Sequence, residues 1–216
     1  MEDHLESRAI RFHYSRPFVP GGRVPQDAHE YDGLILLGAG PLGVVSGPLL
    51  PSLAAELRLA EHFLKQRLPV IGIGLGAVIL AVASGGGAAE EPLRFSVEMA
   101  RRTAADALGG DMPEGFPVAI YMRDRPVLPA GAQVLATGET SGPVVFQVGE
   151  TGVGFLGHPG IKVAMVEDLI MASDDLPEGT AEGLAELRKV QPEIAQALTQ
   201  IMVGLVGKTH WMSSAP

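Results

Sequence analysis

The stretch that most constrains the fold is PVIGIGLGA at residues 69–77, which the apolar run VILAVAS follows. The run at 69–73 predicts a buried strand, and residues 77–84 predict the start of a helix. A strand that turns sharply into a helix holds the apex residue at the end of the sheet, where many enzymes carry a nucleophile. Here the apex is Gly74, which has no side chain. The sequence therefore predicts the scaffold of a catalytic turn without its reactive group.

Glycine (28 residues) and proline (17 residues) divide the chain into alternating segments. Before this stretch we expect strands at 9–14 and 31–37 and a helix at 52–67, capped by Ser52. After it we expect strands at 93–99, 118–122, 133–137, 144–148 and 152–156, then helices at 161–172, 180–190 and 192–206. Parallel βαβ units and a strand-rich insertion predict a three-layer α/β fold, a mostly parallel sheet flanked by helices. We place this domain at 1–176 and a helical extension at 177–216.

Composition excludes several classes of function. The net charge is −9 without a dense basic cluster, so we expect no nucleic-acid partner. No apolar run is long enough to span a membrane and no signal core is visible, so we expect a cytoplasmic protein. The chain has no cysteine, which removes disulfides and thiol nucleophiles. The six histidines (4, 13, 29, 62, 158 and 210) lack ligand spacing on one helix, so we expect no metal.

Residues 38–43, GAGPLG, match the dinucleotide fingerprint G-x-G-x-x-G after a predicted strand. In that fingerprint a helix begins inside the motif and points its N-terminus at the pyrophosphate. Here Pro48 and Pro51 delay the next helix to about residue 52. We therefore expect a glycine-rich loop at a strand end and no cofactor.

Four blocks, taken in order, resemble the class I glutamine amidotransferases over roughly residues 31–172: YDGLILLGAGPLGV, LPVIGIGLGAVILA, LPAGAQVLATGET and VGFLGHPG. The resemblance implies a flavodoxin-like α/β fold and a Cys-His-Glu triad. In such a triad a thiolate attacks the glutamine amide carbon, the histidine moves the proton and the carboxylate orients the histidine. Backbone amides stabilise the oxyanion.

Two triad positions depart from the family pattern. The resemblance places Gly74 at the cysteine and Gly160 at the glutamate, whereas His158 matches the family histidine. It also assigns oxyanion amides to Gly40 and Leu75, and it puts Val78 where a substrate-contacting glutamine is usual. Ala39 replaces a usual glycine, and the stretch YMRDRPVLP lacks the histidine of a common His-Gly-Asp motif. We interpret the chain as a degenerate member in which the scaffold is kept and the glutaminase reaction is lost.

Three functions follow from this interpretation. The leading hypothesis is a non-catalytic structural or regulatory subunit that binds a synthase-type partner enzyme or another copy of itself. The second is a binding module for an amino acid or carboxylate in the pocket that Gly74 enlarges. The third is an enzyme with altered chemistry built on His158 and Ser46.

The ends of the chain bear on these alternatives. Only 30 residues precede Tyr31, so one β–α unit of the family looks shortened and a sheet edge is expected to be uncovered. Near the other end, one apolar stripe either packs on the protein's own sheet or docks a second protein; it comprises Ile194, Leu198, Ile201, Met202 and Leu205. Trp211 is either a lid on the core or an interface anchor.

Overall fold

The computed structural model describes residues 1–17, 19–38 and 40–212, so the Ala39 replacement lies outside the described residues. The elements in chain order are α1 (Glu2–Glu6), β1 (Leu34–Gly38), α2 (Leu53–Lys65), β2 (Val70–Gly74), α3 (Leu75–Ala83), β3 (Gly87–Ala89), β4 (Arg94–Arg102), the short 3-10 helix η1 (Ala107–Gly110), β5 (Gly115–Met122), β6 (Arg125–Val127), β7 (Gln133–Gly138), β8 (Pro143–Val148), β9 (Gly152–Phe155), α4 (Val163–Met171) and α5 (Thr180–Thr209).

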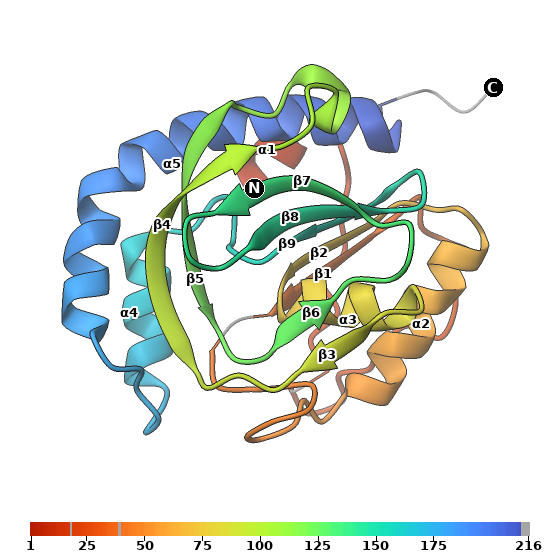
Figure 1. The fold of residues 1–216 in the computed structure, drawn as a ribbon. Helices are drawn as coiled ribbons and strands as arrows, with labels where there is room; N and C mark the ends of the chain where they lie inside the picture. The colour runs from red at the N-terminus through yellow and green to blue at the C-terminus, as the bar shows by residue number, and fades with distance from the viewer. Residues whose placement is uncertain (18, 39, 213–216) are drawn as a thin grey trace.

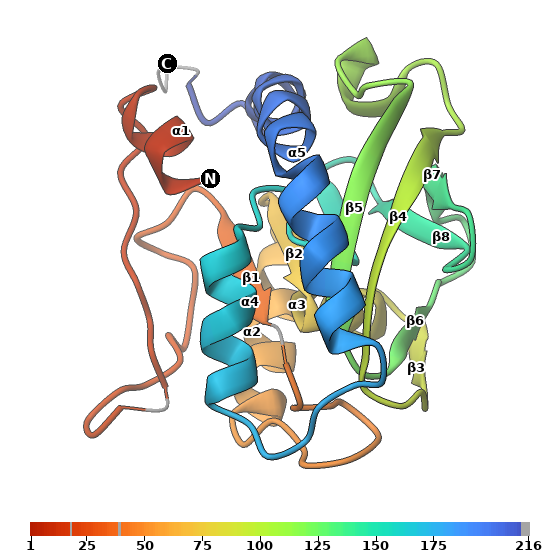
Figure 2. The ribbon, with the colours of Figure 1, turned by 90° about the vertical axis from the view of Figure 1, so that its left-hand side faces the viewer.

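Seven strands form one mixed sheet in the order β1-β2-β9-β8-β7-β4-β5, and β3 pairs with β6 in a separate ribbon. The pairs β1·β2 and β2·β9 are parallel, and the other pairs of the large sheet are antiparallel. The sheet curls into a half-barrel, with α4 and α5 on one side (Figures 1 and 2). This arrangement confirms the predicted α/β fold class, but the sheet is mixed and not mostly parallel, because only two of its six strand pairs are parallel. The strand-rich stretch extends the large sheet with antiparallel strands.

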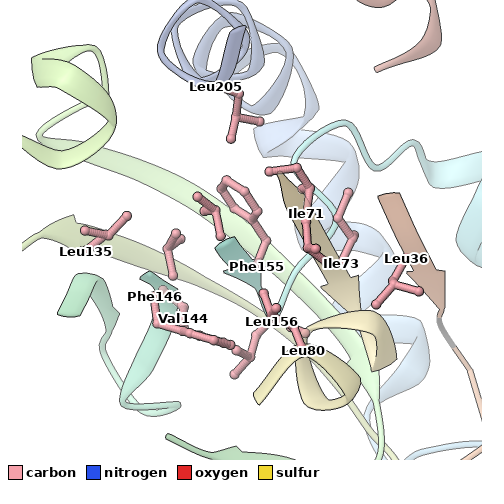
Figure 3. Packing of buried hydrophobic residues seen from close by; sticks show 14 of the residues in the cluster. Leu36, Ile71, Ile73, Leu80, Leu135, Val144, Phe146, Phe155, Leu156 and Leu205 are labelled. Carbon is pink, nitrogen blue, oxygen red and sulfur yellow. The ribbon is translucent and has the colours of Figure 1, made fainter. Parts of the chain in front are cut away.

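The main core lies where β2 and β9 cross the centre of the sheet (Figure 3). All five residues of β2 are buried, as expected for a parallel strand covered on both faces. Helix α3 is apolar nearly throughout, and its residues 75–81 are buried against β1, β2 and β9. The apolar run after the glycine turn thus forms a helix whose residues 75–81 are part of the core. Trp211 packs against the margin of this core, and its Nε1 donates to the Asp32 carbonyl (3.2 Å).

The predicted strand at 9–14 is wrong. Residues 11–16 are exposed and have no strand partner. Among the described residues β1 pairs only with β2, so β1 is an edge of the large sheet. Alternation of apolar residues makes a strand only where a neighbouring strand takes up the backbone hydrogen bonds, and residues 9–14 have none here.

The predicted pair of helices at 180–190 and 192–206 is also wrong, because α5 runs unbroken through Pro192. Proline removes the bond to the Arg188 carbonyl, but both residues are exposed, so water can satisfy that carbonyl. The helix bends as it crosses the sheet (Figure 1), as a proline permits. Its five-residue apolar stripe is buried in the protein's own core. No helix within the described ranges is both long and apolar enough to cross a membrane.

Candidate functional site

The fold brings Gly74 and His158 to the same edge of the sheet. Gly74 ends β2, and His158 follows β9 by three residues. These strands are parallel neighbours, with Ile73 opposite Phe155. Because carboxyl ends of parallel strands meet at one edge, this edge is where a ligand site is expected in such a sheet.

The turn at Gly74 has kept a strained backbone. Its φ is 60° and its ψ is −122°, a combination that residues with side chains rarely adopt. A Cβ added to Gly74 would fall on the carbonyl oxygen of Gly38, the residue opposite it in the β1·β2 ladder. The end of β1 therefore occupies the space that a nucleophile's side chain would need.

The two predicted oxyanion donors, the amides of Gly40 and Leu75, lie at this edge and differ in their hydrogen bonding. The amide of Gly40 donates a hydrogen bond to the Tyr121 carbonyl (3.1 Å), which ties the glycine loop to β5. Leu75 is the first residue of α3, where backbone amides have no acceptor within the helix. Val78 is fully buried in α3, one turn after Gly74. The Gly40 amide is thus already used by the fold.

Apolar side chains stand over the glycine loop. The position that a Cβ on Gly40 would take lies 3.6 Å from Leu169 of α4 and 3.7 Å from the Tyr121 ring. Tyr121 packs edge-to-face on Phe95, with ring centroids 5.7 Å apart. Burial raises the pKa of Tyr121, and the negative charge of Asp175 raises it further. The side chains beside Gly40 therefore belong to the apolar cluster that α4 and α5 cover.

His158 is oriented by backbone where the family pattern has a carboxylate. Its Nδ1 accepts a hydrogen bond from the Gly160 amide (3.0 Å), so the neutral ring carries its proton on Nε2. Burial lowers the pKa of His158 to about 4. Beside the ring lies a cavity of about 10 Å³, room for roughly one water, closed by residues of β5, β8, β9 and α5. The positive charge of the chain's N-terminus lowers this pKa further, so the partly buried histidine is neutral at pH 7.

Asp124 was missed by the reasoning from sequence. It is fully buried two residues after the end of β5, and its Oδ2 accepts hydrogen bonds from the amides of Val44 (2.7 Å), Val45 (2.9 Å) and Ser46 (3.3 Å). The Ser46 hydroxyl donates to the other carboxylate oxygen, Oδ1. Burial alone would raise the pKa of Asp124, but the Ser46 hydroxyl and the amides hold it below its usual value. The signal in the sequence was an aspartate two residues after the end of a buried strand.

Arg123 fastens the same loop from the other side. Its Nε donates to the Pro41 carbonyl, its terminal nitrogen pairs with Asp175, and its guanidinium lies against Gly47. The loop at 41–47 and the segment after α4 are therefore joined through one nearly buried cation. Within the described part of the chain, no group of three His, Cys, Asp or Glu side chains is placed to hold a metal ion.

Solved structures with this fold include glutamine amidotransferases. One from Methylobacillus flagellatus has a TM-score of 0.78 and 20% identity, covering 98% of this chain and 88% of its own. One from Thermotoga maritima has a TM-score of 0.69 and 24% identity, covering 94% and 90%. A protein of Thermoplasma acidophilum described as a subunit of GMP synthase has a TM-score of 0.52 and 18% identity, covering 77% and 79%. No protein-family model and no curated protein sequence matches the chain. These similarities establish the amidotransferase-like fold, and the chemistry has to be argued from the site.

Proposed function

We propose that this chain is a non-catalytic protein of the glutamine amidotransferase fold that acts as a structural or regulatory subunit for another protein. The observation that carries the proposal is at the turn. Glycine stands at the nucleophile position, and the Gly38 carbonyl occupies the place of the missing side chain. Because backbone fills the space that a nucleophilic side chain would occupy, we take the role of this turn to be the packing of β2 against α3.

The other parts of the glutaminase reaction support the same conclusion. The chain has no cysteine to supply a thiolate. Nδ1 of His158 is bound to an amide donor, which cannot stabilise a protonated ring as a carboxylate does. The Gly40 amide, one of the two predicted oxyanion donors, is bound to a carbonyl. The nucleophile position therefore holds a glycine, and the histidine and one oxyanion amide make hydrogen bonds within the fold.

The alternative with Ser46 as nucleophile has less support. Ser46 is buried, and its hydroxyl is hydrogen-bonded to Asp124 and lies 3.4 Å from the Glu91 carbonyl. A nucleophilic hydroxyl needs a base that removes its proton and an open path to the substrate. Asp124, with a lowered pKa and four donors around it, is a poor proton acceptor.

A binding module for free carboxylates also has less support. The amides after the glycine loop form the kind of concave donor group that binds anions. Here they already hold the carboxylate of Asp124. Leu169 and Tyr121 lie in van der Waals range of the space beside Gly40, which leaves little room for a ligand there. The side chain of Asp124 thus occupies the amides that would otherwise bind the carboxylate of a ligand.

Binding a partner protein is the remaining role for such a scaffold. One neighbour is described as a subunit of GMP synthase, and glutaminase domains of this type are expected to work bound to a synthase. A surface for a partner need not include the edge at Gly74 and His158, so it can be kept when the chemistry is lost. We therefore expect a synthase-type protein as the partner class.

Ammonia release from glutamine tests the absence of chemistry. We expect none from the purified chain, from Gly74→Cys or from the double variant Gly74→Cys/Gly160→Glu, because a side chain at 74 meets the Gly38 carbonyl. Circular dichroism must first show that each variant is folded. Glutamine hydrolysis by the unmodified chain that His158→Ala abolishes would refute the proposal. Copurification with native mass measurement then tests the subunit role, which requires a second protein in fixed stoichiometry.

A further inference from the structure

Residues 7–26 differ in charge from the rest of the chain. This stretch contains four arginines (8, 11, 16 and 23) and no acidic residue, which leaves 12 cationic and 25 acidic residues elsewhere. None of these arginines pairs with a carboxylate in the described part of the chain. A basic stretch attached to an acidic body is a candidate for docking on an acidic surface.

We call residues 8–16 the arm. Apolar Ile10, Phe12 and Tyr14 alternate with polar residues along it, which is the pattern of a half-buried strand. Within the described residues, the amides of residues 11–15 make no backbone hydrogen bond. Phe12 and Tyr14 are 39% and 40% exposed and pack edge-to-face on each other, at 5.4 Å. The arm therefore has the pattern of a strand and lacks the partner that a strand needs.

The free edge of β1 is the complementary feature. Its residues pair with β2 on one side, and no described segment pairs with the other side. Leu37 at this edge is 50% exposed. The chain just before β1 carries Asp27, Glu30 and Asp32, all exposed and without a cation partner in the described residues. Unpaired strand edges are sites where another strand adds.

We propose that the arm of one copy of this chain pairs with the β1 edge of a second copy, and that the exchange is reciprocal in a two-fold dimer. Each copy carries both halves of the interaction, an unpaired basic strand pattern and an unpaired edge with carboxylates before it. Such a contact is self-complementary, as a two-fold interface requires. No backbone hydrogen bond joins residues 9–16 to β1 of the same chain in the described residues. The dimer contact does not depend on whether the chain lacks glutaminase activity.

The absence of cysteine makes disulfide mapping a clean test. One preparation carries Leu37→Cys. A second preparation, distinguishable by mass, carries one cysteine in the arm at 12, 13 or 14, so that the three positions scan the register. Mixing and mild oxidation should give a disulfide-linked heterodimer for at least one arm position, at least tenfold above a mixture of the same arm variant with Gln200→Cys. Gln200 is an exposed residue of α5 and serves as the matched control.

Native mass of the unmodified chain gives the second measurement. We expect a dimer at low salt and a shift toward monomer in Arg11→Glu/Arg16→Glu, because arginine–carboxylate attraction across the contact becomes repulsion. A third preparation carries both cysteines in one chain, and a disulfide that forms only within that chain would place the arm on its own β1 and overturn the proposal. A monomer without any heterodimer would overturn it equally. Failure of either kind leaves the glutamine assay unaffected, so the two proposals are tested separately.

Discussion

Replacing Gly74 with alanine tests whether the catalytic turn has closed. Alanine adds only a Cβ, and that atom would fall on the Gly38 carbonyl oxygen. The backbone at Gly74, with φ at 60° and ψ at −122°, also disfavours any residue with a side chain, at about 1–2 kcal/mol. The steric overlap with backbone adds about 1–3 kcal/mol, the usual range for overpacking a dense interior. We expect Gly74→Ala to lower the free energy of unfolding by about 2–5 kcal/mol, the sum of these two effects.

Gly149→Ala is the matched control. Gly149 has a φ of 57°, nearly that of Gly74, and a Cβ added to it would meet no atom within 4 Å. It therefore reports the cost of positive φ without the overlap. Equilibrium urea unfolding, followed by circular dichroism, measures both variants against the unmodified chain. Gly74→Ala should be the less stable of the two by about 1–3 kcal/mol, or about 2–4 °C in melting temperature for each kcal/mol.

Equal losses of stability in the two variants would refute the reasoning. They would mean that the Gly38 carbonyl moves aside at little cost, so that the turn can still accept a side chain. The space for a nucleophile would then be open. The strongest structural support for a non-catalytic protein would be gone, and Gly74→Cys would become a realistic route to restored chemistry.

Three further predictions follow from the buried groups. Folding keeps His158 neutral by lowering its pKa from 6.5 to about 4, so its contribution to stability is complete above pH 6.5 and is lost as the pH falls toward 4; relative to His158→Gln, the chain should lose about 3 kcal/mol over that window in urea titrations at several pH values. Asp124→Asn should cost about 2–4 kcal/mol because three amides and a hydroxyl lose their anionic acceptor, whereas Ser46→Ala should cost about 1 kcal/mol; a smaller loss for Asp124→Asn than for Ser46→Ala would contradict the assignment. Ile201→Ala should cost about 2–5 kcal/mol in thermal unfolding, and Val203→Ala, 47% exposed on the same helix, under about 1 kcal/mol; similar values would show that α5 does not pack as described.

Local pattern was enough to predict the parts of the fold whose partners are close in the chain. The strand at 70–74, its glycine turn and α3 follow from one continuous apolar run. The boundaries of β7 (Gln133–Gly138) and β9 (Gly152–Phe155) also agree with the predicted strands to within one residue. In each case the turn chemistry and the apolar pattern act over a few residues.

The failures arise because burial, solvent exposure and distant groups, none of which a local pattern shows, decide the outcome. The alternating arm is not a strand because no edge pairs with it in this structure. Pro192 does not end α5, since the carbonyl that it leaves free is on the water side. Asp124 is the clearest case. Nothing next to it in the sequence shows that it binds amides about 80 residues earlier in the chain. Its carboxylate nevertheless holds the amides that follow the glycine loop.

The proposed loss of chemistry is compatible with a well-packed chain, because the groups concerned have internal partners. Amidotransferase function needs free amides at the glycine loop, an open turn and an oriented histidine. Here each of these has an internal partner: Gly40 is bound to Tyr121, the turn is filled by Gly38, and His158 is bound to Gly160. Catalytic groups are normally left unsatisfied and strained, at a cost in stability. On the proposal made above, satisfying these groups from within would raise stability at the expense of catalysis, and selection on this chain would then act through its surfaces.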